Sequence, residues 1–425
     1  MAGPEVHVRP YWELTFDADG DPDPGRRDRL LRGVRERGVR DLVVLTHGWN
    51  NDRAMATRLY DAFFTPFPAL APGAGIGYVG VLWPSMRFTD EVIPDFDPSL
   101  AVTTATTPPR TTLDERTRRA LVATFHDSGP VVEQLAGLLD RQPDGVGVFE
   151  QFGGLVRQLV GVRPTALGAD TQEENSPHTA PAMLQENTHD VCLRFADAVE
   201  ATMSGAGFRL PGGLAKAWKG AHELLRQATY FAMKRRAGKV GKEGLGPFLG
   251  QLARDAPGVR VHLVGHSFGA RLVSFALAGL PDADRNVKSV TLLQGAFSHY
   301  TFADRGALKG RQARIDGPLV SCYSRFDSAL GTIYPLASRL AGDDRGALDL
   351  GVRWGAMGFD GIQDVPGAVR LTLAEALRSG VPGAGCVSVD AAQVVRRGSP
   401  PMGAHSDICH EELARLVLGA GRVRA

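Results

Sequence analysis

Short apolar runs recur along the chain, and segments with apolar residues every three or four positions separate them. The apolar runs predict strands at 6–16, 41–46, 76–83, 260–264, 287–294, 318–323 and 386–395. The periodic segments predict helices at 53–64, 245–256, 271–280 and 411–418. Strands that alternate with helices are typical of a mostly parallel sheet covered by helices on both faces. We therefore predict one doubly wound α/β domain over residues 1–425.

Two long excursions, 85–226 and 337–385, interrupt this alternation. The first separates the third predicted strand from the helix before the fourth, and it includes a Thr- and Pro-rich run at 103–109 that favours loop structure. The second holds one helical pattern, at 368–377. We expect the first excursion to be a lid-like insertion and the second to be a smaller insertion.

The end of the first excursion has the pattern of an amphipathic helix, with Leu214, Trp218 and Leu225 on one face. Basic residues lie largely on the other faces, namely Lys216, Lys219, Arg226 and Arg235. A helix packed on the sheet with a solvated basic face is the favoured interpretation. A lid helix, or one that makes a peripheral membrane contact through the insertion, is the alternative.

Composition is that of an ordinary globular protein and restricts the function only loosely. The 425 residues contain 48 Lys and Arg against 47 Asp and Glu, so the net charge of +1 gives no sign of a nucleic-acid partner. The cysteines are scattered without paired spacing, which fits free thiols in a reducing compartment (Cys192, Cys322, Cys386 and Cys409). With no signal sequence and no bilayer-length apolar stretch, a cytoplasmic protein is expected, and export without a cleaved signal stays open.

One glycine-rich segment, 75–80, has the spacing of a dinucleotide-binding loop. It overlaps the start of a predicted strand and opens no helix, so the context that this motif requires is missing. The sequence also lacks a phosphate-binding loop, and we expect no organic cofactor.

The most informative motif runs from Gly265 through Ser267 to Gly269, after a predicted strand and before a predicted helix. This is the setting of a nucleophile elbow, in which a serine on a tight turn exposes its Oγ. Small neighbours let the chain double back, and the N-terminus of the helix directs amide N–H groups at a developing oxyanion. Ser267 is therefore the candidate nucleophile, the alternative being a serine that merely caps the helix.

A nucleophilic serine needs a histidine base and an acid that orients it, and after such an elbow the acid precedes the histidine in the chain. Asp327 follows the predicted strand 318–323, and His405 lies in a small-residue loop before the last helix. His410 is a competitor for the base. Together with Asp407 and Cys409 the two histidines also suggest a metal site, which we disfavour because no second ligand cluster accompanies it.

Oxyanion donors are expected from the residue after the nucleophile, Phe268, and from the loop after strand 41–46. That loop contains His47, Gly48 and Trp49, and Gly48 would let the Trp49 amide face the serine.

In this order His47 and Gly48, the elbow at 265–269, Asp327 and His405 resemble the α/β-hydrolase superfamily and its serine hydrolases. The resemblance implies an esterase or lipase-like enzyme without metal or cofactor, which cleaves small-molecule or lipid esters through an acyl-enzyme. Ser267 would be the nucleophile, His405 the base and then the acid, and Asp327 its orienting partner. Lipases and esterases have several glycines after the histidine, whereas here Trp49 follows one glycine, which leaves substrate size open.

Amide or peptide hydrolysis uses the same machinery, and a non-catalytic interaction protein could keep the same fold. The sequence does not separate these alternatives from ester hydrolysis. It also leaves the oligomeric state open.

Overall fold

The computed structural model describes residues 4–49, 51–86, 88, 112–161, 182–203, 212–333, 355–398 and 402–424. An eight-stranded parallel sheet has the order β1-β3-β2-β4-β5-β6-β8-β7. Its strands are β1 (Tyr11–Thr15), β2 (Asp41–Thr46), β3 (Ile76–Leu82), β4 (Arg260–His266), β5 (Val287–Leu293), β6 (Pro318–Tyr323), β7 (Val369–Thr372) and β8 (Gly385–Asp390). The predicted α/β fold with a parallel sheet is confirmed.

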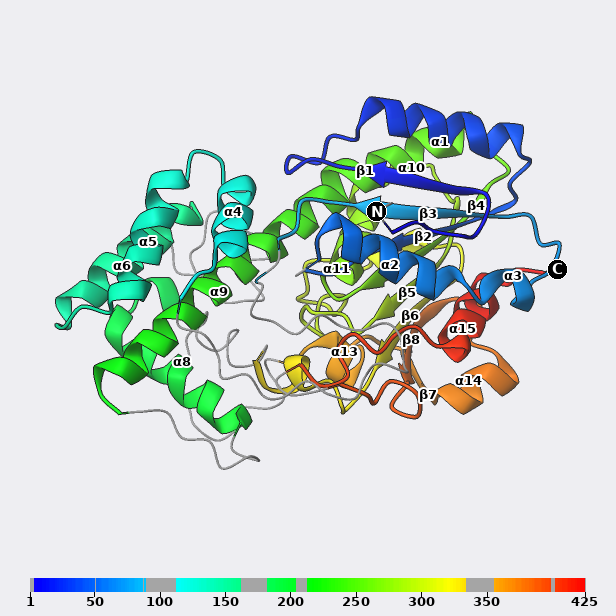
Figure 1. Ribbon diagram of the computed structural model, residues 1–425. Coiled ribbons are helices and arrows are strands. Elements are labelled where there is room, and N and C mark those ends of the chain that lie inside the picture. Colours follow the sequence, from blue (N-terminus) through cyan, green and yellow to red (C-terminus); the bar gives the residue numbers. More distant parts are fainter. Residues whose placement is uncertain are drawn as a thin grey trace.

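Helices cover both faces of this sheet (Figure 1). One face carries α1 (Pro24–Glu36), α10 (Gly246–Asp255) and α11 (Phe268–Gly279). The other carries α2 (Arg53–Phe64), α3 (Phe67–Leu70), α14 (Leu373–Ser379) and α15 (Glu411–Gly421). Two short helices, α13 (Met357–Asp360) and the 3₁₀ turn η4 (Arg311–Arg314), lie in connections between strands.

Alternation along the central strands explains why both faces are buried. All six residues of β2 are buried, with Leu42 and Val44 in one apolar cluster and Val43 and Leu45 in the other. Successive side chains of a strand point to opposite faces, so an apolar run of this kind needs helices on both sides.

The strand order reverses at the middle of the sheet. From β2 the chain passes through α2 to β3 on one side, whereas β4 pairs with β2 on the other side and continues to β5 and β6. In open α/β sheets the crevice at the carboxyl ends of such neighbouring strands is where ligands bind. The loops after β2 and β4 therefore meet at the position expected for a functional site.

A group of helices lies beside the sheet and comes from the predicted first excursion, 85–226 (Figure 1). It comprises α4 (Glu115–Thr124), α5 (Gly129–Arg141), α6 (Gly147–Leu159), η1 (Ala182–Leu184) and α8 (Thr188–Met203). The long helix α9 (Leu214–Lys239) runs from this group to the sheet layer and continues through the π-helical turn η3 (Val240–Leu245) into α10. The Thr- and Pro-rich run 103–109 lies outside the described residues.

The prediction for α9 is right about its existence and wrong about its surroundings. It packs on α8 and α11 rather than directly on the sheet, and Trp218 is only 1% exposed, with its ring 4.6 Å from that of Phe149. Its basic side chains are not simply solvated. Lys216 pairs with Asp197 and Glu200 of α8 at 2.5 and 2.9 Å. The face that carries Trp218 therefore serves internal packing.

Several predicted boundaries are wrong. The strand predicted at 6–16 forms only over β1, and the strand predicted at 386–395 ends with β8 at Asp390. The helix predicted at 271–280 begins at Phe268, directly after the elbow. The helix predicted at 368–377 is divided, because Thr372 and Glu375 form a capping box that starts α14 after the edge strand β7. Part of the second excursion thus belongs to the sheet.

All four cysteines are free thiols. Among the described residues, no helix combines the length and the apolar character needed to cross a bilayer.

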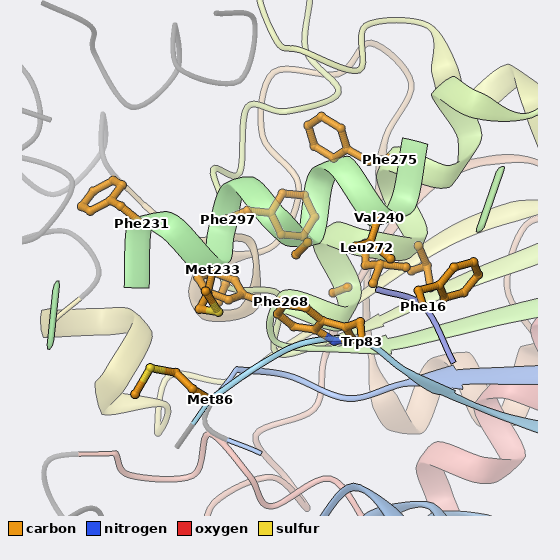
Figure 2. Packing of buried hydrophobic residues seen from close by; sticks show 14 of the residues in the cluster. Phe16, Trp83, Met86, Phe231, Met233, Val240, Phe268, Leu272, Phe275 and Phe297 are labelled. Carbon is orange, nitrogen blue, oxygen red and sulfur yellow. The ribbon is translucent and has the colours of Figure 1, made fainter. Parts of the chain in front are cut away.

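The packing of α11 against η3 leaves no room for a side chain at Gly241. Leu272 of α11 lies beside Val240 in the cluster shown in Figure 2, and a Cβ atom at Gly241 would come within 2.2 Å of the Leu272 carbonyl oxygen. We predict that Gly241→Ala lowers the free energy of unfolding by about 1–3 kcal/mol, because α11 and η3 must move apart. Urea denaturation measures this change.

The matched control is Gly419→Ala on α15, where no atom lies within 4 Å of the added methyl group. Alanine is the better helix former by about 1 kcal/mol, so this variant should keep or increase stability. Equal destabilisation by both substitutions would contradict the packing argument.

Candidate active site

Ser267 occupies a strained turn between β4 and α11. Its backbone has φ 56° and ψ −118°, a conformation that L-residues rarely adopt. Its N–H donates to the Leu293 carbonyl on β5 at 3.0 Å, and its own carbonyl accepts from Ala270 and Ala296 at 3.1 and 3.3 Å. Hydrogen bonds to its N–H and to its carbonyl therefore hold this turn on both sides.

The glycines around Ser267 are required by close contacts. A Cβ atom at Gly265 would lie 2.4 Å from the Gly269 carbonyl oxygen, and one at Gly269 would lie 2.1 Å from the Thr46 carbonyl oxygen on β2. A Cβ atom at Gly48 would lie 2.6 Å from the Cβ of Ser267. These three positions let the strand, the first turn of α11 and the loop after β2 meet at the serine.

Three of the predicted site residues form one hydrogen-bonded chain. Ser267 Oγ is 2.9 Å from His405 Nε2, and His405 Nδ1 is 2.8 Å from Asp327 Oδ2. Because a carboxylate only accepts, Nδ1 carries the proton and Nε2 of the neutral ring accepts from the serine hydroxyl. Asp327 is 0% exposed, whereas Ser267 and His405 are 6% and 7% exposed. The structure thus brings together residues up to 138 positions apart.

Asp327 lies just beyond the carboxyl end of β6. Its N–H donates to the Ser324 carbonyl at 3.1 Å, and the Ser324 hydroxyl donates to the Val395 carbonyl at 2.6 Å. Besides His405, the carboxylate accepts from the Leu330 N–H at 3.1 Å and from Gln294 Nε2 at 3.2 Å. These donors supply the hydrogen bonds that a fully buried carboxylate cannot receive from water.

His266 fixes the loop that carries His405. Its Nε2 donates to the His405 carbonyl oxygen at 2.9 Å, and the two rings lie 5.1 Å apart. Burial, with the nearby His405 as a second cause, lowers the pKa of His266 to about 3. His266 is therefore neutral over the physiological range. The elbow motif does not specify the residue at this position, so the sequence gives no sign of this role.

His405 and His410, the two candidates for the base, have different partners. His410 Nε2 lies 2.8 Å from Asp407 Oδ1, while the other oxygen of Asp407 accepts from the backbone N–H groups of Arg396 and Arg397. His405 instead faces Ser267. Among the described residues, no group of three or more His, Cys, Asp or Glu side chains has the arrangement of a metal site.

The loop after β2 is held by aromatic residues. The ring of His47 stacks on Trp83 at 5.5 Å, and Trp83 Nε1 donates to the His47 carbonyl at 3.0 Å. The His47 N–H lies 3.1 Å from the hydroxyl of Tyr60, which itself bonds the Val81 carbonyl. Burial lowers the pKa of His47 to about 4, so this residue is also neutral. His47 thus shapes the loop and does not face Ser267 as a base.

Trp49 and Phe268, the predicted oxyanion donors, lie on opposite sides of Ser267 in the chain and pack together in space. Their rings are 6.4 Å apart, and Tyr230 of α9 contacts both, at 5.4 Å from Trp49 and 4.5 Å from Phe268. Neither N–H donates a backbone hydrogen bond to another described residue. The sequence did not identify Tyr230, because nothing in the pattern of α9 relates that residue to the elbow.

Comparisons of the chain with protein-family models, with curated proteins and with solved structures found no match.

The buried neutral histidines make stability depend on pH. An unfolded histidine takes up a proton near pH 6.5, but folded His266 does so only near 3, so stability from His266 is complete above 6.5 and is lost as the pH falls toward 3. We predict that His266→Gln reduces the slope of the unfolding free energy against pH by about 1.4 kcal/mol per unit between about pH 5.5 and 4.

Urea denaturation across this pH range measures the slope. The control is His126→Gln, because His126 is exposed on the surface. A slope that His266→Gln leaves unchanged would show that His266 does not stay neutral in the folded protein.

Proposed function

We propose that the chain is a serine hydrolase of the α/β-hydrolase type that cleaves carboxylic esters through an acyl-enzyme. The observation that carries this proposal is the hydrogen-bonded chain from Ser267 through His405 to Asp327, at 2.9 and 2.8 Å. The strained elbow supports it, as does the position of the serine beside the reversal of strand order.

In the acylation step, Ser267 Oγ attacks the ester carbonyl carbon while His405 Nε2 takes the hydroxyl proton. The resulting imidazolium is stabilised by the buried Asp327 carboxylate at Nδ1. When the tetrahedral intermediate collapses, the bond to the alcohol breaks and His405 gives its proton to the leaving oxygen. The acyl group then remains on Ser267.

The negative oxygen of the intermediate needs donors that are already in place. Phe268 is the first residue of α11, so its N–H lies at the positive end of the helix dipole. Gly48, directly before Trp49, lies against Ser267. In deacylation His405 takes a proton from water, which attacks the acyl carbon, and then returns the proton to Ser267 Oγ. The enzyme is restored without a metal or cofactor in either step.

The surroundings of the serine favour an ester with an apolar part. Trp49 and Tyr230 are half-buried and form an aromatic cluster with the fully buried Phe268, the residue after the serine. Such rings bind apolar acyl or alcohol groups without providing charged contacts. Amide hydrolysis would use the same Ser267, His405 and Asp327 and is the second outcome that a substrate screen distinguishes.

A fluorophosphonate probe tests the activated serine directly. We predict covalent labelling at Ser267, located by mass spectrometry, because the probe reacts with a serine whose hydroxyl proton is removed by a base. Ser267→Ala should abolish labelling. Ser274→Ala is the matched control, since Ser274 is a buried serine of the same helix that bonds the Ala270 carbonyl.

A folded wild-type protein that the probe does not label would contradict the proposal. That result would favour a non-catalytic interaction protein. Labelling with hydrolysis of amides but not of esters would keep the activated serine and change the substrate class.

The orienting role of the acid gives a separate prediction. Asp327→Asn should lower kcat for p-nitrophenyl butyrate by about 10⁴-fold, because an amide partner favours the wrong histidine tautomer and does not stabilise the imidazolium. Steady-state kinetics measure kcat. The control Asp316→Asn removes an exposed carboxylate that pairs with Lys288 near the amino end of β6, and it should leave kcat unchanged. Equal activity of both variants would exclude Asp327 as the acid.

A further inference from the structure

Gln294 is an unusual residue beside the candidate active site. It directly follows β5, is 0% exposed, and has a positive φ of 48°. Its neighbours hold the backbone of the nucleophile, since the Leu293 carbonyl accepts from the Ser267 N–H and the Ala296 N–H donates to the Ser267 carbonyl. Its side chain therefore starts from a backbone that is fixed relative to Ser267.

The side-chain amide of Gln294 points at two acceptors. Nε2 lies 3.2 Å from Asp327 Oδ2 and 2.9 Å from the Gly358 carbonyl oxygen. A carboxylate and a carbonyl can only accept, so the NH₂ group and not the oxygen must face them. The orientation of the amide is thus determined by its partners.

Gln294 donates to the same carboxylate oxygen of Asp327 as His405 does. Asp327 Oδ2 accepts from both His405 Nδ1 and Gln294 Nε2, while Oδ1 accepts from the Leu330 N–H. Among the described residues, Gln294 is the only side chain besides His405 that donates to Asp327. Two fixed donors, one from Gln294 and one from the backbone, hold the carboxylate plane so that Oδ2 faces His405.

Two features of Gln294 are energetically unfavourable on their own. A non-glycine residue at positive φ is strained, and the buried Oε1 accepts no hydrogen bond from the described residues. The hydrogen bond from Nε2 to the Gly358 carbonyl also requires that Gly358 lie close to Gln294. A Cβ atom at Gly358 would be 2.3 Å from the Gln294 carbonyl carbon. An apolar side chain would satisfy the packing without the unpaired oxygen, so packing alone does not account for a glutamine here.

We infer that Gln294 is a positioning residue for Asp327, an inference that rests on the proposed serine hydrolase function. It orients the carboxylate so that Oδ2 faces His405. It acts through Asp327 and does not touch the substrate.

Gln294→Met tests this role because methionine keeps the length of the side chain and removes the donor. For p-nitrophenyl butyrate we expect kcat to fall about tenfold or more, as for loss of a hydrogen bond to a charged group, while KM stays unchanged. The matched control is Gln227→Met on α9, a buried glutamine whose Nε2 bonds Glu223. It should keep the wild-type kcat.

Gln294→Glu supplies a second, independent measurement with a side chain of the same shape. Two buried carboxyl groups in contact share a proton, so at low pH the new carboxyl group donates to Asp327 as the amide does. As the pH rises the shared proton is lost and the two charges repel. The ratio of variant to wild-type kcat should therefore fall as the pH is raised and the shared proton is lost.

The outcomes separate this inference from the proposed function. If the wild type neither reacts with the fluorophosphonate nor hydrolyses the ester, both fall together. If the wild type is active and Gln294→Met keeps its kcat, or the Gln294→Glu ratio does not change with pH, only the role of Gln294 is overturned. A lower kcat for Gln294→Met with a pH-dependent ratio for Gln294→Glu supports it.

Discussion

The contact between the first turn of α11 and the end of β2 is the constraint on which the rest of the site depends. A Cβ atom at Gly269, in the first turn of α11, would lie only 2.1 Å from the Thr46 carbonyl oxygen at the end of β2, so this contact requires glycine. This contact places Ser267 against Gly48 in the loop that follows β2. With any larger residue at position 269, the helix and the strand would have to separate, and Ser267 would move away from Gly48.

The remaining residues of the site lie near Ser267 because they follow strands that end at the same edge of the sheet. Parallel strands end on the same side, so loops after β4, β5, β6 and β8 converge although they are far apart in sequence. The convergence is reinforced by bonds between loops, such as His266 to the His405 carbonyl and the Ala404 N–H to the Phe326 carbonyl at 2.9 Å. Asp327 and His405 therefore depend on each other's loops for their positions.

The sequence was informative where local rules and global order agreed. The elbow at 265–269 has its own steric signature, and Asp327 and His405 follow from the order of residues after such an elbow. Prediction failed where a tertiary contact decides. The edge strand β7 reads as helix because only its pairing with β8 makes it extended, and the basic side chains of α9 meet partners that periodicity does not reveal. The only sequence feature that singles out Gln294 is a polar residue at the end of an apolar strand. That feature does not predict a hydrogen bond to Asp327.

The three histidines near Ser267 show how environment assigns different roles to one residue type. Burial keeps His47 and His266 neutral, and each bonds a backbone carbonyl, His47 that of Gly48 at 2.8 Å and His266 that of His405. Of the three, only His405 has a carboxylate at one ring nitrogen and the serine hydroxyl at the other. Burial disfavours a positive ring at His47 and His266, so His405 is the one of the three whose partners fit the base of the proposed mechanism.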